Sequence, residues 1–205
     1  MSSSDGDGPG RGVLVPRREN GRQRVQALLD AAAALIAERG LDSVTMAEIA
    51  RKAGANIGSL YRFFPNKAHV VQALIQAYGE RSDEAYARMA EQAPQLSPET
   101  LGDALIDMML GLRRDVALMR SMVDVGPEGD AVRADFRARK RRRIESVLRA
   151  HSPALTAAEL DAIGHVLLNN MKFAADIATK GETATLAELR LMTRLYLRDR
   201  LPGRA

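Results

Sequence analysis

The side chains best suited to chemistry gather in the stretch TMAEIARKAGANIGSLYRFFPNK, residues 45–67. If Gly54 forms a turn between two short helices, the second helix presents an outer face of short polar and basic groups. Its base-facing candidates are Asn56, Ile57, Ser59 and Arg62. Gly58 lets the backbone approach a partner closely. Such groups near a helix N-terminus suit the major groove of DNA, where base edges present donors and acceptors.

Three further groups lie towards the flanks of this face, namely Thr45, Tyr61 and Lys67. A hydroxyl, a phenol and an ammonium beside helix N-termini can bind phosphate oxygens. The helices that position them bury Ile49, Ala53, Leu60 and Phe63, and Asn56 caps the second helix. Two short helices around a glycine also occur in proteins that do not bind DNA. On spacing alone, Tyr61 as a core aromatic and Lys67 as a solvated surface lysine remain open.

Composition excludes several function classes. The 205 residues carry 30 basic and 26 acidic side chains, a net charge of +4 that indicates no particular partner. The absence of cysteine excludes disulfides and thiolate metal sites and suits a reducing cytoplasm. The three histidines lie far apart in sequence, and no catalytic triad order or phosphate loop occurs. We therefore expect a cytoplasmic protein that is not an enzyme and has no metal, cofactor or catalytic residue.

Helical spacing runs through most of the chain after a Gly-, Ser- and Asp-rich start. The pattern predicts helices near 22–39, 46–53, 57–63, 67–91, 98–114, 116–123, 128–150, 157–180 and 186–200. Capping boxes are predicted at Thr45–Glu48, Thr156–Glu159 and Thr185–Glu188. No segment alternates like a strand, and no apolar run approaches the ~20 residues that span a bilayer. We predict an all-α fold with no place in a membrane.

Residues from about 22 to 76 resemble the TetR family of bacterial transcriptional regulators. The likeness rests on the first-helix pattern LLDAAAALIAERG, the helix-starting Thr45, the turn AG, the motif GSLY and the NK that opens the next helix. It implies that Thr45, Tyr61 and Lys67 contact phosphates and that the base-facing candidates read the groove. The implied domains are a disordered, basic-ended tail (1–20), a three-helix DNA-binding head (21–81) and a helical body (82–205) for ligand binding and dimerisation.

The body carries apolar stripes for which the resemblance suggests roles. A pocket for an apolar or amphipathic small molecule is predicted to be lined by Met108, Met109, Leu112, Phe136, Asn170 and Phe173. Family members usually pair their last two long helices, so the predicted dimer interface comprises Ile163, Leu167, Asn170, Leu189, Met192 and Tyr196. A plain core is the alternative for any of these side chains.

Two basic segments leave their roles open. The run RARKRRR, residues 137–143, fits a solvated helix face with Lys140 and Arg143 close to its inner side, or a cationic wall for an anionic ligand. The arginines of residues 11–24 fit a minor-groove arm or a solubilising tail. The predicted function is a ligand-responsive regulator, most consistent with a repressor, that binds a palindromic operator as a homodimer. The alternative is a sequence-nonspecific architectural DNA-binding protein.

Overall fold

The computed structural model describes residues 19–123 and 128–201, and between 114 and 137 the only side chains it describes are those of Asp115 and Leu118. Within these ranges the regular structure is helical throughout, which confirms the all-α prediction. The chain divides into two compact units, one ending at Ala77 and the other beginning at Tyr78. We call residues 19–77 the head and residues 78–201 the body. The predicted tail lies almost wholly outside the described residues.

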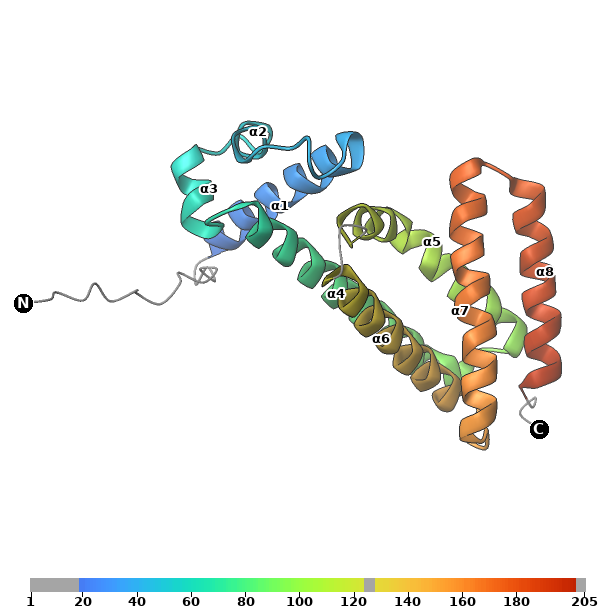
Figure 1. Cartoon of the computed structure of the whole chain (residues 1–205). Helices are drawn as coiled ribbons and strands as arrows, with labels where there is room; N and C mark the ends of the chain where they lie inside the picture. Colours follow the sequence, from blue (N-terminus) through green and yellow to red (C-terminus); the bar gives the residue numbers. More distant parts are fainter. Residues whose placement is uncertain (1–18, 124–127, 202–205) are drawn as a thin grey trace, which may run out of the picture. The chain divides into compact units, whose positions relative to one another are not determined.

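The head consists of α1 (Glu19–Arg39), α2 (Met46–Lys52), α3 (Ile57–Phe63) and the first part of α4 (Lys67–Gln92), as Figure 1 shows. α1 ends because Gly40 adopts φ +78°, a left-handed conformation that glycine takes without steric cost. Its apolar stripe faces inward, and Leu28, Ala32 and Ile36 are almost fully buried. α2 packs on α1 and α3 packs on α2. Ile49, Leu60 and Phe63 are buried as their spacing predicted, whereas Ala53 ends α2 and is only half-buried.

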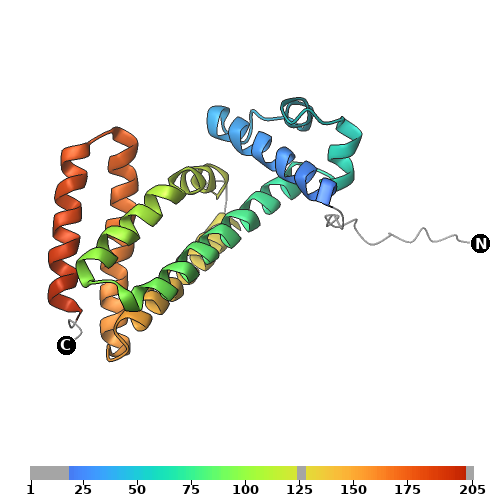
Figure 2. The ribbon, with the colours of Figure 1, turned by 180° about the vertical axis from the view of Figure 1, so that it is seen from behind.

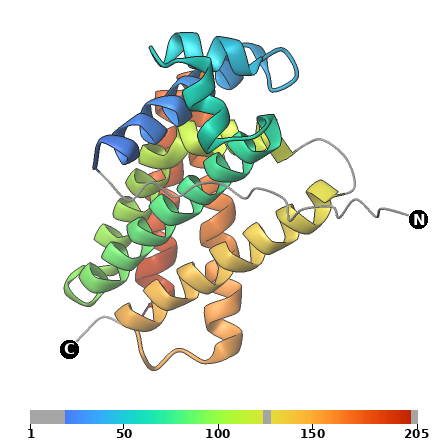
Figure 3. The same cartoon turned by 90° about the vertical axis from the view of Figure 1, so that its left-hand side faces the viewer.

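The body contains the rest of α4, the short 3-10 helix η1 (Ala93–Gln95), α5 (Pro98–Val123), α6 (Glu128–His151), α7 (Ala157–Lys180) and α8 (Thr183–Arg200). α7 and α8 lie side by side and both pack on α5 (Figures 1 and 2). α6 packs on α7 and is joined to it by a short turn (Figure 3). The shared core contains Leu101, Leu105, Ile144, Leu148, Ile163 and Leu167.

Three predicted helix boundaries were wrong. The first helix begins at Glu19, three residues before its predicted start at 22. The segments 98–114 and 116–123 form one helix, α5, because no proline interrupts the chain there and the Asp115 carboxylate, which could have capped a second helix, accepts from Arg81 instead. The last helix begins at Thr183, so Thr185 lies inside the first turn and makes no capping box with Glu188. The other two boxes, at Thr45 and Thr156, are confirmed.

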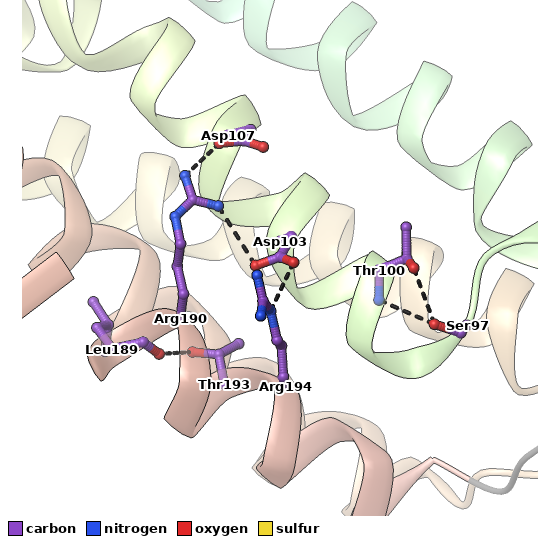
Figure 4. A network of polar contacts seen from close by, with 8 residues as sticks. All are labelled: Ser97, Thr100, Asp103, Asp107, Leu189, Arg190, Thr193 and Arg194. Atoms are coloured by element: carbon purple, nitrogen blue, oxygen red, sulfur yellow. Dashed lines mark hydrogen bonds and ion pairs between the residues drawn. The ribbon is translucent and has the colours of Figure 1, made fainter. Parts of the chain in front are cut away.

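Charged side chains fasten α8 to α5 (Figure 4). Arg194 Nε donates to Asp103 Oδ2 at 2.8 Å, and Arg190 bonds Asp107 one turn further along α5. Beneath them the buried Thr193 hydroxyl donates to its own helix, at Leu189 O. Such partly exposed ion pairs contribute little stability, about 0–1 kcal/mol each, but they fix the register of the two helices.

Candidate nucleic-acid interface

The turn between α2 and α3 is closed by backbone bonds that only a left-handed residue permits. Gly54 has φ +61°, as its position in the sequence predicted. Around it, Gly54 N donates to Arg51 O and Ala55 N donates to Ala50 O at 2.9 Å. Ala50 is buried with 3% exposure, which allows α2 and α3 to cross closely. The result is a rigid helix-turn-helix.

Asn56 caps α3, as predicted. Its Oδ1 accepts from Gly58 N at 2.8 Å, while its side-chain nitrogen has no partner among the described residues. That amide is therefore a free donor at the N-terminus of the helix. A Cβ on Gly58 would lie 3.2 Å from the same Oδ1, so glycine here also keeps the cap in place. The N-terminus of α3 presents a donor group with little side-chain bulk around it.

The outer face of α3 carries exposed groups one turn apart. Ile57 is 41% exposed and Tyr61 is 50% exposed. Burial of such large side chains would stabilise the folded head, so their exposure is unusual. Arg62 is also exposed, and its guanidinium lies 4.9 Å from the centroid of the Phe63 ring. Behind this face Leu60 and Phe63 are buried. Tyr61 is thus not the core aromatic that spacing alone allowed.

Ser59 differs from the other predicted base contacts. Its Oγ is inaccessible to solvent and has no hydrogen-bond partner in the described chain. Of the four predicted base-facing residues, Asn56, Ile57 and Arg62 are therefore exposed on one helix, whereas the Ser59 hydroxyl is not at the exposed surface. Its position at the third residue of a seven-residue helix did not reveal this.

Thr45 is engaged in the capping box that starts α2. Its Oγ1 donates to Glu48 Oε2 at 2.8 Å, and its backbone N donates to the same oxygen at 2.9 Å. Arg39 also donates to Glu48, at 3.0 Å. These bonds, led by those from Thr45, lower the pKa of the Glu48 carboxyl to about 2. The Thr45 hydroxyl proton is thus already used within the head.

Lys67 is also bonded inside the head. Its Nζ donates to Leu41 O at 2.9 Å and to Val44 O at 3.1 Å, with a longer contact to Asp42 O at 3.4 Å. An ammonium has three protons, and these three carbonyls of the loop between α1 and α2 accept them. In this structure Lys67 closes a loop, a role that its sequence position did not indicate.

The predicted pocket residues do not share one environment. Met109 is buried, Met108 and Leu112 are half-buried, and Phe173 is 52% exposed at the surface. Asn170 donates to Thr193 Oγ1 at 3.2 Å. Phe136 lies outside the residues whose side chains are described. The two methionines remain candidates for a pocket lining, whereas the exposed ring of Phe173 fits an interface.

The predicted dimer residues separate into two groups. Ile163, Leu167 and Leu189 are buried within the body, with 4% exposure or less, so they have no surface to offer a second chain. Met192 is 52% exposed, and Tyr196 and Asn170 are half-buried. The exposed apolar side chains of α7 and α8 are instead Val166, Phe173, Leu191, Met192 and Leu195.

Two buried polar side chains of the body belong to Tyr86, which the sequence did not single out, and Arg143, whose partners the sequence did not reveal. Tyr86 is 3% exposed, its hydroxyl has no partner among the described residues, and burial raises its pKa. Arg143 is 8% exposed and bonds α4. Its burial confirms the prediction that it lies close to the inner side of α6, but its partners could not be read from the pattern.

No helix in the described ranges is long and apolar enough to cross a membrane. Likewise, no three histidine or acidic side chains gather as a metal site within those ranges.

Residues 28–74 match the family described as bacterial regulatory proteins, tetR family. The regulator ArpR of Pseudomonas putida, described as a probable HTH-type transcriptional regulator, is 36% identical over 86 residues, which cover 42% of this chain and 40% of ArpR. The HTH-type transcriptional repressor KstR of Mycolicibacterium smegmatis is 35% identical over 69 residues, which cover 34% of each chain. The chain thus spans well under half the length of these relatives.

Solved structures extend the likeness to the whole fold. The regulator FadR of Bacillus subtilis, in complex with stearoyl-CoA, has a TM-score of 0.63 at 16% identity and covers 86% of this chain and 99% of its own. A TetR-like regulator from Rhodococcus has a TM-score of 0.61 at 24% identity, and the match covers 88% of this chain and 96% of the Rhodococcus chain. At these identities the comparison shows the fold and not the ligand.

Proposed function

The chain belongs, through its helix-turn-helix head, to the TetR family of bacterial regulatory proteins, and we propose that it is a repressor. In this proposal it binds a palindromic operator as a homodimer and is released by a small apolar or amphipathic effector. Its relatives are transcriptional regulators, and KstR is a repressor.

The observation that carries the DNA-binding proposal is the exposed face of α3. Ile57 and Tyr61 remain 41% and 50% exposed while the opposite side of the same short helix is buried. Leaving apolar surface in water costs about 25 cal/mol per Å², so a face of this kind fits a partner surface. Asn56 would donate to a base edge, Ile57 would contact a thymine methyl, and Arg62 would pair with guanine or phosphate. Tyr61 and the helix N-terminus would bind phosphates.

Dimerisation through α7 and α8 is the second element of the proposal. Phe173 and Val166 lie seven residues apart on one face of α7, and Leu191 and Leu195 lie one turn apart on α8. All four are more than a third exposed, although the two helices lie side by side and could have buried them against each other. A second copy would cover them, and its two-fold symmetry would present two heads to a palindrome.

The effector would bind inside the body. Tyr86 belongs to the apolar core, yet its hydroxyl lacks a partner in the described chain. A buried hydroxyl left unsatisfied costs about 1–3 kcal/mol, so a polar ligand atom bonded there would recover that loss. Met89 and Met109 belong to the same core cluster as Tyr86 and can adapt to an apolar group. FadR of Bacillus subtilis holds stearoyl-CoA, and NalD of Pseudomonas aeruginosa represses an efflux pump, which fits effectors of amphipathic character.

Selection of bound sites from a random DNA pool, at controlled salt concentration, tests the proposal. We expect a palindromic motif whose recovery is lost in the Ile57→Ala and Asn56→Ala variants. Lys52→Ala is the matched control, because Lys52 is exposed on α2 and is not assigned a base contact. Each lost base contact should cost about 1–3 kcal/mol of discrimination.

Two other outcomes would contradict it. Binding without any enriched motif, falling steeply as salt rises, would favour the architectural alternative. A motif with a single half-site would argue against the homodimer and leave the exposed face of α7 and α8 without its proposed partner.

A further inference from the structure

The hydroxyl of Tyr86 differs from the other buried polar groups of the body. The side chain is 3% exposed, and its hydroxyl has no hydrogen-bond partner in the described part of the chain. The other described polar side chains that are buried in the body all make hydrogen bonds. They are Ser82, Arg143, His151, Ser152 and Thr193. A buried polar group without a partner is rare in folded proteins, so the Tyr86 hydroxyl needs an explanation.

The surroundings of Tyr86 are apolar. Its ring belongs to a core cluster with Leu101, Leu105 and Met109, and Met89 follows three residues later on the same side of α4. Burial raises the pKa of Tyr86, so the phenol stays protonated near neutral pH and keeps a proton to donate. An atom that accepts this proton would lie in the same apolar surroundings.

Arg143 supplies the charge that acts on the Tyr86 phenol in the described chain. Its Nε bonds the Asp83 carboxylate, its Nη1 donates to Ser82 Oγ at 3.0 Å, and its Nη2 donates to Gly79 O at 3.2 Å. A ligand carboxylate beside Tyr86 would be the second carboxylate around one guanidinium. A buried charge without a counterion of its own is costly, so the position favours an uncharged ligand atom.

We propose that the Tyr86 hydroxyl donates a hydrogen bond to a carbonyl oxygen of the effector, which is an uncharged and mainly apolar ketone, ester or amide. This effector class rests on the proposed function, because it takes the body to be the part that binds the effector. A carbonyl oxygen accepts a proton from a phenol without bringing a charge into the core. The apolar part of the molecule would lie against Met89 and Met109, whose flexible side chains can rearrange around it.

Calorimetric titration of the full chain with 2-decanone and with decanoate at pH 7.5 tests the proposal. Both probes have the same number of carbon atoms, but one is a neutral ketone and the other is a carboxylate anion. We expect 2-decanone to bind about tenfold more tightly than decanoate. Tyr86→Phe keeps the ring and removes only the hydroxyl, so it should weaken the binding of 2-decanone about tenfold, as the loss of one buried hydrogen bond does.

Tyr78→Phe is the matched control. Tyr78 is also buried on α4, and its hydroxyl is hydrogen-bonded to Ser82. This variant should bind 2-decanone as the unaltered chain does. Without any probe, Tyr86→Phe should keep or raise the melting temperature, because it removes an unsatisfied group, whereas Tyr78→Phe should lower it.

Several results would overturn the proposal. They are no binding of 2-decanone, tighter binding of decanoate, and equal affinity of Tyr86→Phe and the unaltered chain for 2-decanone. A melting temperature that falls as far in Tyr86→Phe as in Tyr78→Phe would also overturn it, because the Tyr86 hydroxyl would then already be bonded within the fold.

Operator binding on the same preparations separates this proposal from the proposed function. If the chain binds a palindrome and the ketone results fail, the effector class is wrong and the regulator remains. If the chain binds no palindrome and Tyr86→Phe still weakens the binding of 2-decanone, the carbonyl site stands and the regulator is refuted.

Discussion

Lys67 provides the sharpest test of how the head is built. Family resemblance assigns its ammonium to a DNA phosphate, whereas the structure bonds it to three carbonyls between α1 and α2. Lys67→Met keeps most of the apolar stem and removes every donor. Two good bonds from one charged donor contribute about 2 kcal/mol to the free energy of unfolding. For a unit of this size that corresponds to a fall in the head's melting temperature of about 10 °C.

The two roles of Lys67 also differ in the salt dependence of DNA binding. Each phosphate contact adds about 0.9 to the slope of log affinity against log salt. Loss of one phosphate contact per head would lower the slope of a dimer by about 1.8. The loop-closing role predicts an unchanged slope together with the lower melting temperature. Lys52→Met is the control and should leave the melting temperature unchanged.

The opposite pair of results would refute this reasoning. If Lys67→Met leaves the melting temperature of the head unchanged and lowers the salt slope, its ammonium binds DNA and leaves the loop when it does so. Differential scanning calorimetry and fluorescence anisotropy at several salt concentrations measure the two quantities on the same preparation.

Three more predictions concern separate contacts. Because the pKa of Glu48 is lowered from 4.5 to about 2, its contribution to stability is present above pH 4.5 and is lost as the pH falls towards 2. Glu48→Gln should therefore flatten the dependence of the head's melting temperature on pH in that window, and an unchanged curve would contradict it. Arg143→Met removes the bonds of a buried guanidinium to Ser82, Gly79 and Asp83 and should destabilise the body by about 3 kcal/mol. Asp83→Asn, at the exposed end of the Arg143–Asp83 ion pair, should lower the free energy of unfolding by less than about 1 kcal/mol in chemical denaturation. If the Arg143 and Asp83 variants lose equal stability, the buried arginine does not have the larger structural role assigned to it. Phe173→Glu should convert the proposed dimer to monomers in sedimentation velocity at an unchanged melting temperature of the monomer, and a persistent dimer would move the interface elsewhere.

Most of the fold followed from local rules that a sequence displays. Thr45 and Thr156 start helices because their side chains cap amides three residues on. Gly54 makes the turn because it alone can take φ +61° there at no steric cost. Most of the outer face of α3 also followed from helical spacing, since residues one turn apart must share a face, but Ser59 was wrongly assigned to it.

Tertiary structure decided which apolar side chains are inside. α7 is apolar over a broad arc, and spacing could not tell that Ile163 and Leu167 would be buried while Phe173 stayed exposed. The width of the arc that a neighbouring helix covers depends on how the two helices cross. The three predicted interface residues that proved buried failed for this reason.

The roles of the long cationic side chains were also decided by the fold. Lys67 and Arg143 bond partners that lie 23 or more residues away along the chain, and no periodicity encodes such distances. A flexible stem with a charged end binds whichever carbonyl or carboxylate packing brings within reach. The sequence by itself determined most of the helices, the turn and the family resemblance of the head. Only the packed chain decided which cations hold it together, because their partners are brought within reach by helix packing and not by neighbouring sequence.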